Sequence, residues 1–224
     1  MESMNKIEAV LFDLDGTLLD SFPDFLASLH NMPFKNQSRE INENIVRANV
    51  SDGSSKLLKL VFDINEDDKD FDEHKRNFLN EYEKNIFMHG NLFPGISDLL
   101  NFLLEKKIPY GIVTNKPRKY TEIILKKSSL LRQSKVVICC DDGFKSKPYP
   151  EGINHACNIL GVPNSKCIYI GDHANDLNAS LSAGTISGVC TFGYGFEKGL
   201  TVDGVESFQS PEQILDFIKR NVWS

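Results

Sequence analysis

The fold of this 224-residue chain is decided by the stretch Val10-Leu11-Phe12-Asp13-Leu14-Asp15-Gly16-Thr17-Leu18-Leu19. The apolar run from Ile7 to Phe12 predicts a buried β-strand. It ends in two carboxylates, Asp13 and Asp15, after which Gly16 lets the chain turn. Open α/β sheets bind their ligands at the carboxyl ends of strands, so we expect the pair at such an edge. Two carboxylates this close repel each other, which indicates a metal ion, a catalytic pair or both.

The composition excludes several classes of protein. Hydrophobic residues make up 41% and charged residues 25% of the chain, as in an ordinary soluble globular protein. The net charge of -6 argues against a nucleic-acid groove or an anionic membrane surface as the main partner. No apolar run approaches the ~20 residues of a membrane-spanning helix, and the first residues lack the apolar core of a secretory signal. We therefore expect neither a nucleic-acid nor a membrane partner.

The five cysteines have no C-x-x-C spacing, and their number is odd. Most lie in apolar runs, where a free cysteine usually serves as a small buried hydrophobic residue. This usage predicts a reducing cytoplasmic location and argues against a metal–thiolate site.

The density and spacing of apolar residues change at about residues 20 and 90. Between them the apolar residues are sparse, several fall at helical spacing, and we find no good strand. From residue 92 onward, apolar strands and amphipathic helices are expected to alternate. The expected helices are 96–107, 117–129, 149–160, 176–183 and 211–221, and the expected strands are 110–114, 136–140, 167–170 and 186–192.

This alternation predicts an α/β fold with a Rossmann-like parallel sheet covered by helices on both faces. The first strand belongs to the same sheet. We therefore expect a core built from residues 1–19 and 91–224, with an all-helical domain of residues 20–90 inserted after the first strand.

Polar residues follow three of the later strands. Thr114 and Asn115 supply a hydroxyl and backbone amides that can bind an anion, although an ordinary helix cap is the alternative. Lys147, stiffened by a following proline, can neutralise a phosphate or the carboxylate pair, unless it is a solvated surface residue. Asp172 and Asp176 open a helix at positions i and i+4, where acids also complement the helix dipole.

Taken together, these side chains favour a functional site over four separate structural roles. The carboxyl ends of parallel strands share one edge of a sheet, so all four sets are expected to meet there. Carboxylate oxygens without a histidine or cysteine cluster are typical of a Mg²⁺ site. A threonine and a lysine facing that cation indicate a phosphate.

At this point the chain resembles a known family, the haloacid dehalogenase (HAD) superfamily, over nearly its whole length. The residues that match its four motifs, in order, are Asp13-Leu14-Asp15-Gly16-Thr17, Thr114, Lys147 and Gly171-Asp172 with Asp176. The helical insertion resembles the cap that members carry between the first and second motifs. The phosphoglycolate phosphatase group is similar at Leu19-Asp20-Ser21-Phe22-Pro23-Asp24, Val113-Thr114-Asn115-Lys116-Pro117 and Ser146-Lys147-Pro148. N-acetylmuramate-6-phosphate phosphatases are similar at His89, Leu92-Phe93-Pro94-Gly95 and Tyr194.

The resemblance implies a Mg²⁺-dependent phosphatase that works through an aspartyl phosphate. Asp13 would attack phosphorus, and Asp15 would protonate the leaving alcohol and then activate water. The Asp13 carboxylate, the Asp15 backbone carbonyl and Asp172 would hold the metal, with Asp176 as a direct ligand or in the outer shell.

The resemblance also implies the groups that bind phosphate. Thr114, the Asn115 amide and Lys147 would hold its remaining oxygens. His173-Ala174 departs from the residues common within the fourth motif, but it touches no matched ligand position.

We expect the inserted domain to choose the substrate. Ser51, Gly53 and Ser54 precede a helix, where amides and hydroxyls can meet a substrate carboxylate. Arg47 is a candidate clamp for an anion. A purely structural role for these residues is the alternative.

The leading hypothesis is a phosphatase for small phosphorylated metabolites, similar to phosphoglycolate phosphatase, acting as a monomer or homodimer. The alternatives are an N-acetylmuramate-6-phosphate or other sugar-phosphate phosphatase, a phosphomutase, and a non-catalytic interaction protein with the same fold. The acidic Asp15 argues against a dehalogenase, which needs no second acid in the first motif.

Overall fold

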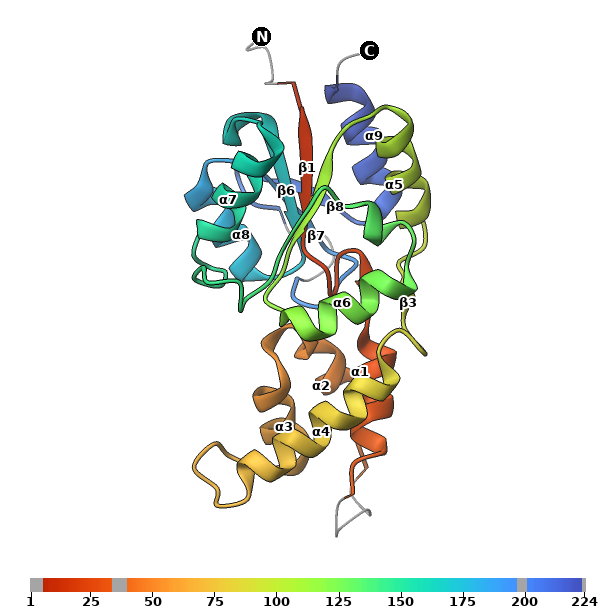
Figure 1. Cartoon of the computed structure of the whole chain (residues 1–224), viewed down its shortest axis with the longest axis vertical. Helices are drawn as coiled ribbons and strands as arrows, with labels where there is room; N and C mark the ends of the chain where they lie inside the picture. Colours follow the sequence, from red (N-terminus) through yellow and green to blue (C-terminus); the bar gives the residue numbers. More distant parts are fainter. Residues whose placement is uncertain (1–5, 34–39, 197–200, 223–224) are drawn as a thin grey trace. The chain divides into compact units, whose positions relative to one another are not determined.

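The structure is a computed structural model that describes residues 6–33, 40–196 and 201–222. The chain divides into two compact units, one of Met1–Leu19 with Leu92–Ser224 and the other of Asp20–Asn91. Figure 1 shows both units. The second unit spans almost the same residues as the insertion expected at 20–90.

Unit 1 is built on a six-stranded sheet in the order β5-β4-β1-β6-β7-β8. Every neighbouring pair of strands in it is parallel, which confirms the predicted α/β class. The strands are β1 (Ala9–Phe12), β4 (Tyr110–Val113), β5 (Val136–Ile138), β6 (Cys167–Gly171), β7 (Ile186–Cys190) and β8 (Glu206–Phe208).

Helices cover both faces of this sheet. In Figure 1, α7 and α8 lie on one side of β1, and α5 and α9 lie on the other. The helices of the unit are α5 (Ile96–Glu105), α6 (Arg118–Lys127), α7 (Glu151–Leu160), α8 (Ala174–Ala183) and α9 (Pro211–Asn221), with short 3-10 turns η2 (Leu131–Gln133) and η3 (Asn164–Lys166). Because the central strand is covered on both faces, all four residues of β1 are fully buried.

The apolar spacing explains why these helices form where they do. In α9, Pro211 suits the first turn, and Ile214, Phe217 and Ile218 recur at helical spacing on the buried side. Helix α5 ends two residues earlier than expected, and Lys107 beyond it has a left-handed φ of 56°.

Unit 2 is helical in its described residues, apart from the two strand residues at its ends. Its elements are α1 (Phe22–His30), α2 (Glu43–Ala48), the 3-10 turn η1 (Val50–Asp52), α3 (Ser54–Phe62) and α4 (Phe71–Asn85). The chain passes between the units through β2 (Leu19–Asp20) and β3 (Asn91–Leu92), which form a two-stranded sheet.

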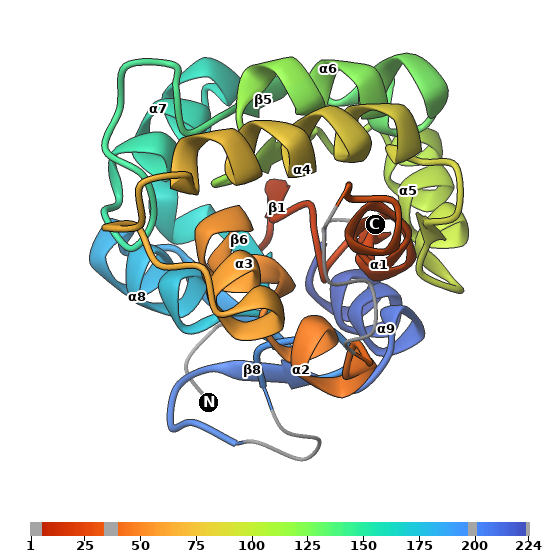
Figure 2. The same ribbon diagram turned by 90° about the horizontal axis from the view of Figure 1, so that it is seen from below.

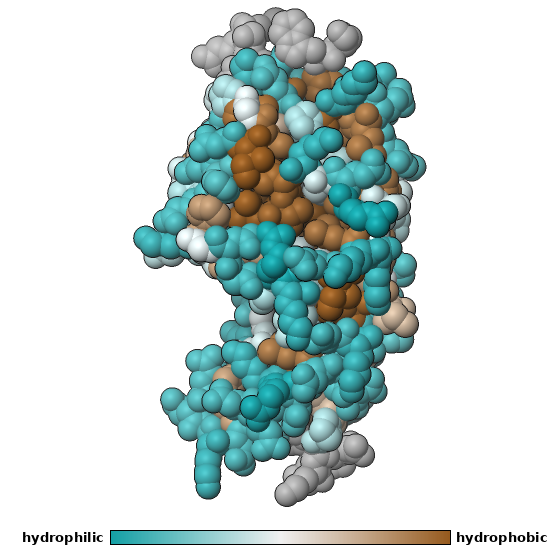
Figure 3. Space-filling model, viewed as in Figure 1, coloured by the Kyte–Doolittle hydropathy of each residue, from teal (hydrophilic) through white to brown (hydrophobic). Residues whose placement is uncertain are grey.

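An aromatic cluster joins α1 to α4 within unit 2. The ring centroids of Phe25 and Tyr82 are 4.3 Å apart, and Phe78 lies 6.1 Å from Phe25. Figure 2, seen from below, shows α1 nearly end-on with one end of α4 next to it. The surface of this unit is mostly hydrophilic in the view of Figure 3, as the sparse apolar residues of its sequence predict.

One buried carboxylate fixes the end of unit 2. Asp24 has no exposed surface, and its oxygens accept hydrogen bonds from four successive backbone N–H groups. The donors and distances are Phe87 (2.6 Å), Met88 (3.2 Å), His89 (2.8 Å) and Gly90 (2.9 Å). Asp24 therefore ties helix α1 to the segment that leads back to unit 1.

Among the described residues, no helix combines the length and the apolar character that crossing a membrane requires.

Candidate active site

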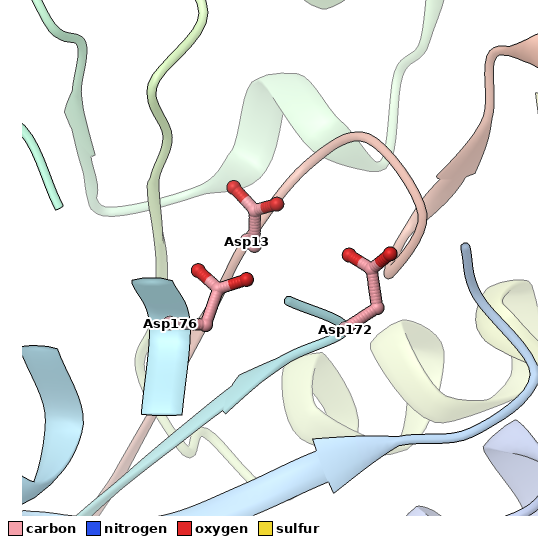
Figure 4. A group of neighbouring side chains, drawn as sticks. All are labelled: Asp13, Asp172 and Asp176. Carbon is pink, nitrogen blue, oxygen red and sulfur yellow. The ribbon is translucent and has the colours of Figure 1, made fainter. Parts of the chain in front are cut away.

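Three buried carboxylates meet at the carboxyl ends of β1 and β6. Asp13 follows β1 directly, Asp172 follows β6, and Asp176 lies in the first turn of α8. One oxygen from each lies within 4.8 Å of the others. Figure 4 shows the three side chains next to one another, with their carboxylate groups directed to the same side. Their exposed fractions are 6%, 0% and 2%, so this is an interior cluster and not an acidic surface.

Lys147 lies between two of these carboxylates. Its Nζ donates to Asp13 Oδ1 at 2.7 Å and to Asp176 Oδ1 at 2.5 Å. The side chain of Asn115 fixes the backbone of this lysine, because it accepts from the Lys147 N–H and donates to the Lys147 carbonyl, each at 2.9 Å. The Asn115 side chain therefore holds Lys147 in place, and only its backbone amide remains a predicted phosphate contact.

Burial and neighbouring charges shift the pKa values of Asp13, Asp172 and Lys147 upward. Burial, opposed by Lys147 and reinforced by Asp176, raises the pKa of Asp13 to about 7. Burial and the charges of Asp13 and Asp176 raise the pKa of Asp172 well above its usual range. Burial lowers the pKa of Lys147, but the two carboxylates outweigh it and the net shift is upward.

The cluster fits a divalent cation. Among the described residues, the donors to Asp172 are neutral, since its oxygens accept from the Thr17 hydroxyl at 3.2 Å and from the Tyr194 backbone N–H at 2.9 Å. Two of the three carboxylates, Asp13 and Asp176, share the Lys147 ammonium group. The donors are all oxygens, which suits a hard cation such as Mg²⁺.

Asp15 lies beside this cluster but does not belong to it. Its two carboxylate oxygens lie 3.1 and 2.9 Å from Nζ of Lys116, a residue that is 7% exposed. Asp13 and Asp15 thus contact different lysines, Lys147 and Lys116. The predicted contact of Asp15 with metal is through its backbone carbonyl and stays a prediction.

The tight turn after Asp13 requires glycine. Gly16 has a φ of 82°, and a Cβ there would lie 2.2 Å from Asp172 Oδ2. On the adjacent strand, Thr114 follows β4, is 4% exposed, and accepts through Oγ1 from the Lys116 N–H at 3.2 Å. Thr114 is thus at the same edge of the sheet as the carboxylates.

The four residues expected to bind the rest of the substrate all belong to unit 2. Arg47 pairs with Asp20 at 3.5 Å and lies over the Phe22 ring, with 5.3 Å between Cζ and the ring centroid. The other three gather at the start of α3: Ser51 in η1, Gly53 with a φ of 88°, and Ser54 as the first helical residue. Within the described part of the chain, the buried Ser51 Oγ has no hydrogen-bond partner. Their role stays a prediction.

Sequence reasoning gave no role in the site to four contributors, Thr17, Lys116, Tyr169 and Tyr194, although all but Tyr169 stand among the residues that carry the family resemblance. A signal existed for Lys116, a cation directly after the predicted phosphate-binding residues. Tyr169 gave no such signal, because it lies inside an apolar strand and reads as a core residue. The contact of Tyr194 is made by its backbone, which no side-chain pattern reveals.

The chain matches the model of one protein family and is similar in sequence to proteins that are named as phosphatases. Residues 10–189 match the family model of haloacid dehalogenase-like hydrolases. An N-acetylmuramic acid 6-phosphate phosphatase of Pseudomonas putida is 32% identical over 189 residues, which cover 84% of this chain and 85% of that protein. A phosphoglycolate phosphatase of Xanthomonas campestris is 35% identical over 186 residues, covering 83% and 84%.

Solved structures share the fold. The crystal structure of a predicted phosphoglycolate phosphatase from Haemophilus somnus superposes with a TM-score of 0.80 at 24% identity. The match covers 96% of this chain and 99% of the other. At this identity the likeness shows the fold alone.

Proposed function

The chain belongs to the haloacid dehalogenase-like hydrolase family, and from that premise we propose that it is a Mg²⁺-dependent phosphatase of small phosphorylated metabolites. The single observation that carries the proposal is the buried group of Asp13, Asp172 and Asp176 with Lys147 between them. The relatives at 32 and 35% identity are named as phosphatases, which supports a phosphoric monoester hydrolase.

Asp13 is proposed as the nucleophile. One of its carboxylate oxygens forms a bond to phosphorus while the bond from phosphorus to the substrate alcohol breaks. Asp15 gives its proton to the departing oxygen. Asp15 then takes a proton from water as the water oxygen attacks phosphorus, which frees Asp13 and releases inorganic phosphate.

The remaining charges of the site support this transfer. Asp13, Asp172 and the Asp15 carbonyl would hold Mg²⁺, with Asp176 as a direct ligand or in the outer shell, and the bound ion would screen the nucleophile from the negative charge of the phosphate. Lys147 would neutralise the charge on the phosphoryl oxygens. Thr114 and the Asn115 amide would complete this set of donors.

The names of the relatives narrow the substrate to two candidates. Phosphoglycolate and N-acetylmuramic acid 6-phosphate differ in size, but each carries a phosphate monoester and a carboxylate. We propose that Arg47, Ser51, Gly53 and Ser54 bind that carboxylate. Within the described residues, the Ser51 hydroxyl has no hydrogen-bond partner and a Cβ added to Gly53 would meet no atom within 4 Å, which supports this role. Phosphoglycolate is the leading candidate, and N-acetylmuramic acid 6-phosphate is the alternative. The identities of 32 and 35% to the two kinds of phosphatase are too similar to distinguish between these substrates.

The test is release of inorganic phosphate from four compounds. They are 2-phosphoglycolate, N-acetylmuramic acid 6-phosphate, N-acetylglucosamine 6-phosphate, which lacks the carboxylate, and p-nitrophenyl phosphate. We expect release with Mg²⁺, none with EDTA, and a preference for one of the two carboxylate-bearing metabolites. Conversion of a sugar phosphate to an isomer without free phosphate would instead indicate a phosphomutase. No turnover of any compound would contradict the proposal.

A further inference from the structure

Tyr169 occupies the centre of the site, yet the proposed reaction gives it no task. It lies on β6 three residues before Asp172 and has no exposed surface. Its hydroxyl lies 2.8 Å from Lys147 Nζ, 2.8 Å from Asp176 Oδ1 and 3.0 Å from the Val113 carbonyl oxygen. A buried tyrosine normally needs one partner for its hydroxyl, and this hydroxyl has three.

The hydrogen bonds of Lys147 explain why the hydroxyl matters. A lysine ammonium has three N–H groups, and here they face Asp13 Oδ1, Asp176 Oδ1 and the Tyr169 hydroxyl. The hydroxyl accepts from Lys147 and keeps its own hydrogen for Asp176 or the Val113 carbonyl. Without it, the third N–H would lose its acceptor, and the ammonium would be held only by the two carboxylates.

The hydroxyl also connects Lys147 to rigid structure. Val113 is the last residue of β4 and Tyr169 the middle residue of β6, the two strands that pair with β1 on either side. The Tyr169 hydroxyl lies 3.0 Å from the Val113 carbonyl oxygen, so it reaches across β1, whose end carries Asp13. Lys147 itself comes from a loop, since it precedes α7 and belongs to no strand. The tyrosine hydroxyl thus fixes the ammonium relative to the sheet.

We propose that Tyr169 is a positioning residue, which holds the Lys147 ammonium between Asp13 and Asp176 so that it meets the phosphoryl oxygens during transfer. The inference rests on the proposed function and extends it. Tyr169 touches no reacting atom and acts through Lys147. Catalytic groups must be held within fractions of an ångström, and the neighbours that hold them set the rate without touching substrate.

The chain offers a matched control in Tyr110. This residue is 1% exposed, lies on β4, and donates its hydroxyl hydrogen to the Leu130 carbonyl at 2.6 Å. It opens the strand, whereas Thr114 and the site lie beyond the other end. The variants Tyr169→Phe and Tyr110→Phe each remove one buried, hydrogen-bonded hydroxyl and leave the ring. Only the first removes a contact to Lys147.

The experiment measures kcat and KM for p-nitrophenyl phosphate at saturating Mg²⁺, inhibition by orthovanadate, and the melting temperature of each variant. Tyr169→Phe is expected to lower kcat at least about tenfold with less than about a threefold change in KM, because the lost contact acts mainly in the transition state. Orthovanadate, which mimics that state, should bind about tenfold more weakly. Tyr110→Phe should change each of these constants less than about twofold while melting at a comparably lowered temperature.

The outcomes distinguish a positioning role of Tyr169 from a purely structural one. Equal activity in the two tyrosine variants, or a loss confined to KM, would overturn the positioning role. Failure of Tyr169→Phe to fold while Tyr110→Phe folds would show a structural role and would also overturn it. If the wild-type protein releases no phosphate, the proposed function fails instead.

Discussion

Among the described residues, carboxylates are buried in two places, and their surroundings there are opposite in kind. In unit 2, Asp24 is surrounded by four backbone N–H groups, each within 3.2 Å. In unit 1, Asp172 is equally buried but has one hydroxyl and one backbone N–H, and two further carboxylates as neighbours. Backbone N–H donors compensate the burial of a carboxylate, whereas carboxylates that crowd together repel one another.

The difference shows how to separate a structural from a functional buried acid. The four N–H groups around Asp24 already satisfy it, so its task is to hold the chain. The cluster around Asp172 has more negative charge than Lys147 can offset, and a cation would complete it. Removing charge should therefore destabilise the first place and relieve the second.

The largest expected effect is the loss of activity when the proposed nucleophile, Asp13, is replaced. Asp13→Asn should fold, because it removes a charge from a crowded cluster, and should lose at least about 10³-fold in kcat, or about 4 kcal/mol of barrier. Phosphate release by the purified variant, with circular dichroism to show folding, measures this. Retention of a tenth of wild-type turnover would contradict the assignment of Asp13.

The next prediction compares how stability changes when a carboxylate is removed from each of the two places. Asp24→Ala removes the acceptor of the Phe87, His89 and Gly90 N–H groups, whereas the Met88 N–H keeps the Asn85 carbonyl at 2.9 Å, and the change should lower the free energy of unfolding by about 3 kcal/mol or more. Asp172→Asn should instead leave the metal-free protein at least as stable as the wild type, because burial and the neighbouring carboxylates already disfavour a charge at this position. Denaturant unfolding of both variants in EDTA provides the comparison. Loss of stability in both variants would mean that the two places do not differ as described.

Metal binding should stabilise the cluster in a pH-dependent way. The pKa of Asp13 in the folded, metal-free protein is raised to about 7 from 3.8. Proton binding therefore favours the metal-free fold, and this stabilisation, complete below pH 3.8, is lost as the pH rises through about 7. Mg²⁺ competes with those protons, so the rise in melting temperature on adding Mg²⁺ should be larger at pH 8 than at pH 6. At 100 times its Kd, a ligand contributes about 2.7 kcal/mol.

The matched control for this prediction is again Asp24. A conservative Asp24→Asn protein should melt at a lower temperature than wild type but gain the same increment from Mg²⁺, since Asp24 takes no part in the cluster. A Mg²⁺ increment that is independent of pH, or that vanishes in Asp24→Asn, would argue against the proposed cation site.

The smallest effect concerns substrate choice. Ser51→Ala removes a hydroxyl that has no hydrogen-bond partner among the described residues, so it should leave stability nearly unchanged. If Ser51 binds the substrate carboxylate, kcat/KM for the preferred metabolite should fall about tenfold, or about 1.4 kcal/mol. Hydrolysis of p-nitrophenyl phosphate, which lacks the carboxylate, should change less than about threefold. Equal losses on both compounds would assign Ser51 to the fold of unit 2.

Much of the fold could be predicted because strands and helices alternate with clear apolar patterns. The predicted closing helix 211–221 has the bounds of α9. Strand β8 escaped prediction because it has three residues, one of them charged, which is too short for any periodicity. Helix α7 begins at Glu151, two residues later than expected, because Pro150 takes the N-cap position.

The candidate site could be predicted in part, because the topology of a parallel sheet places strand ends together. Phe12 pairs with Ile112 on one side and with Ile170 on the other, so the residues that follow these strands become neighbours. That rule locates Asp13, Asp172 and Thr114. It does not reveal which lysine pairs with which acid, nor the link made by Tyr169, because both depend on side-chain packing between elements far apart in sequence.

The central claim is that the buried cluster transfers a phosphoryl group through Asp13. The most direct measurement is to mix enzyme, Mg²⁺ and substrate, quench with borohydride, and analyse the peptide containing residue 13 by mass spectrometry. Borohydride reduces an acyl phosphate to an alcohol, so turnover should convert Asp13 to homoserine, and omission of Mg²⁺ or substrate should abolish the conversion. Rapid phosphate release with Asp13 unmodified, or reduction of a different carboxylate, would contradict the account.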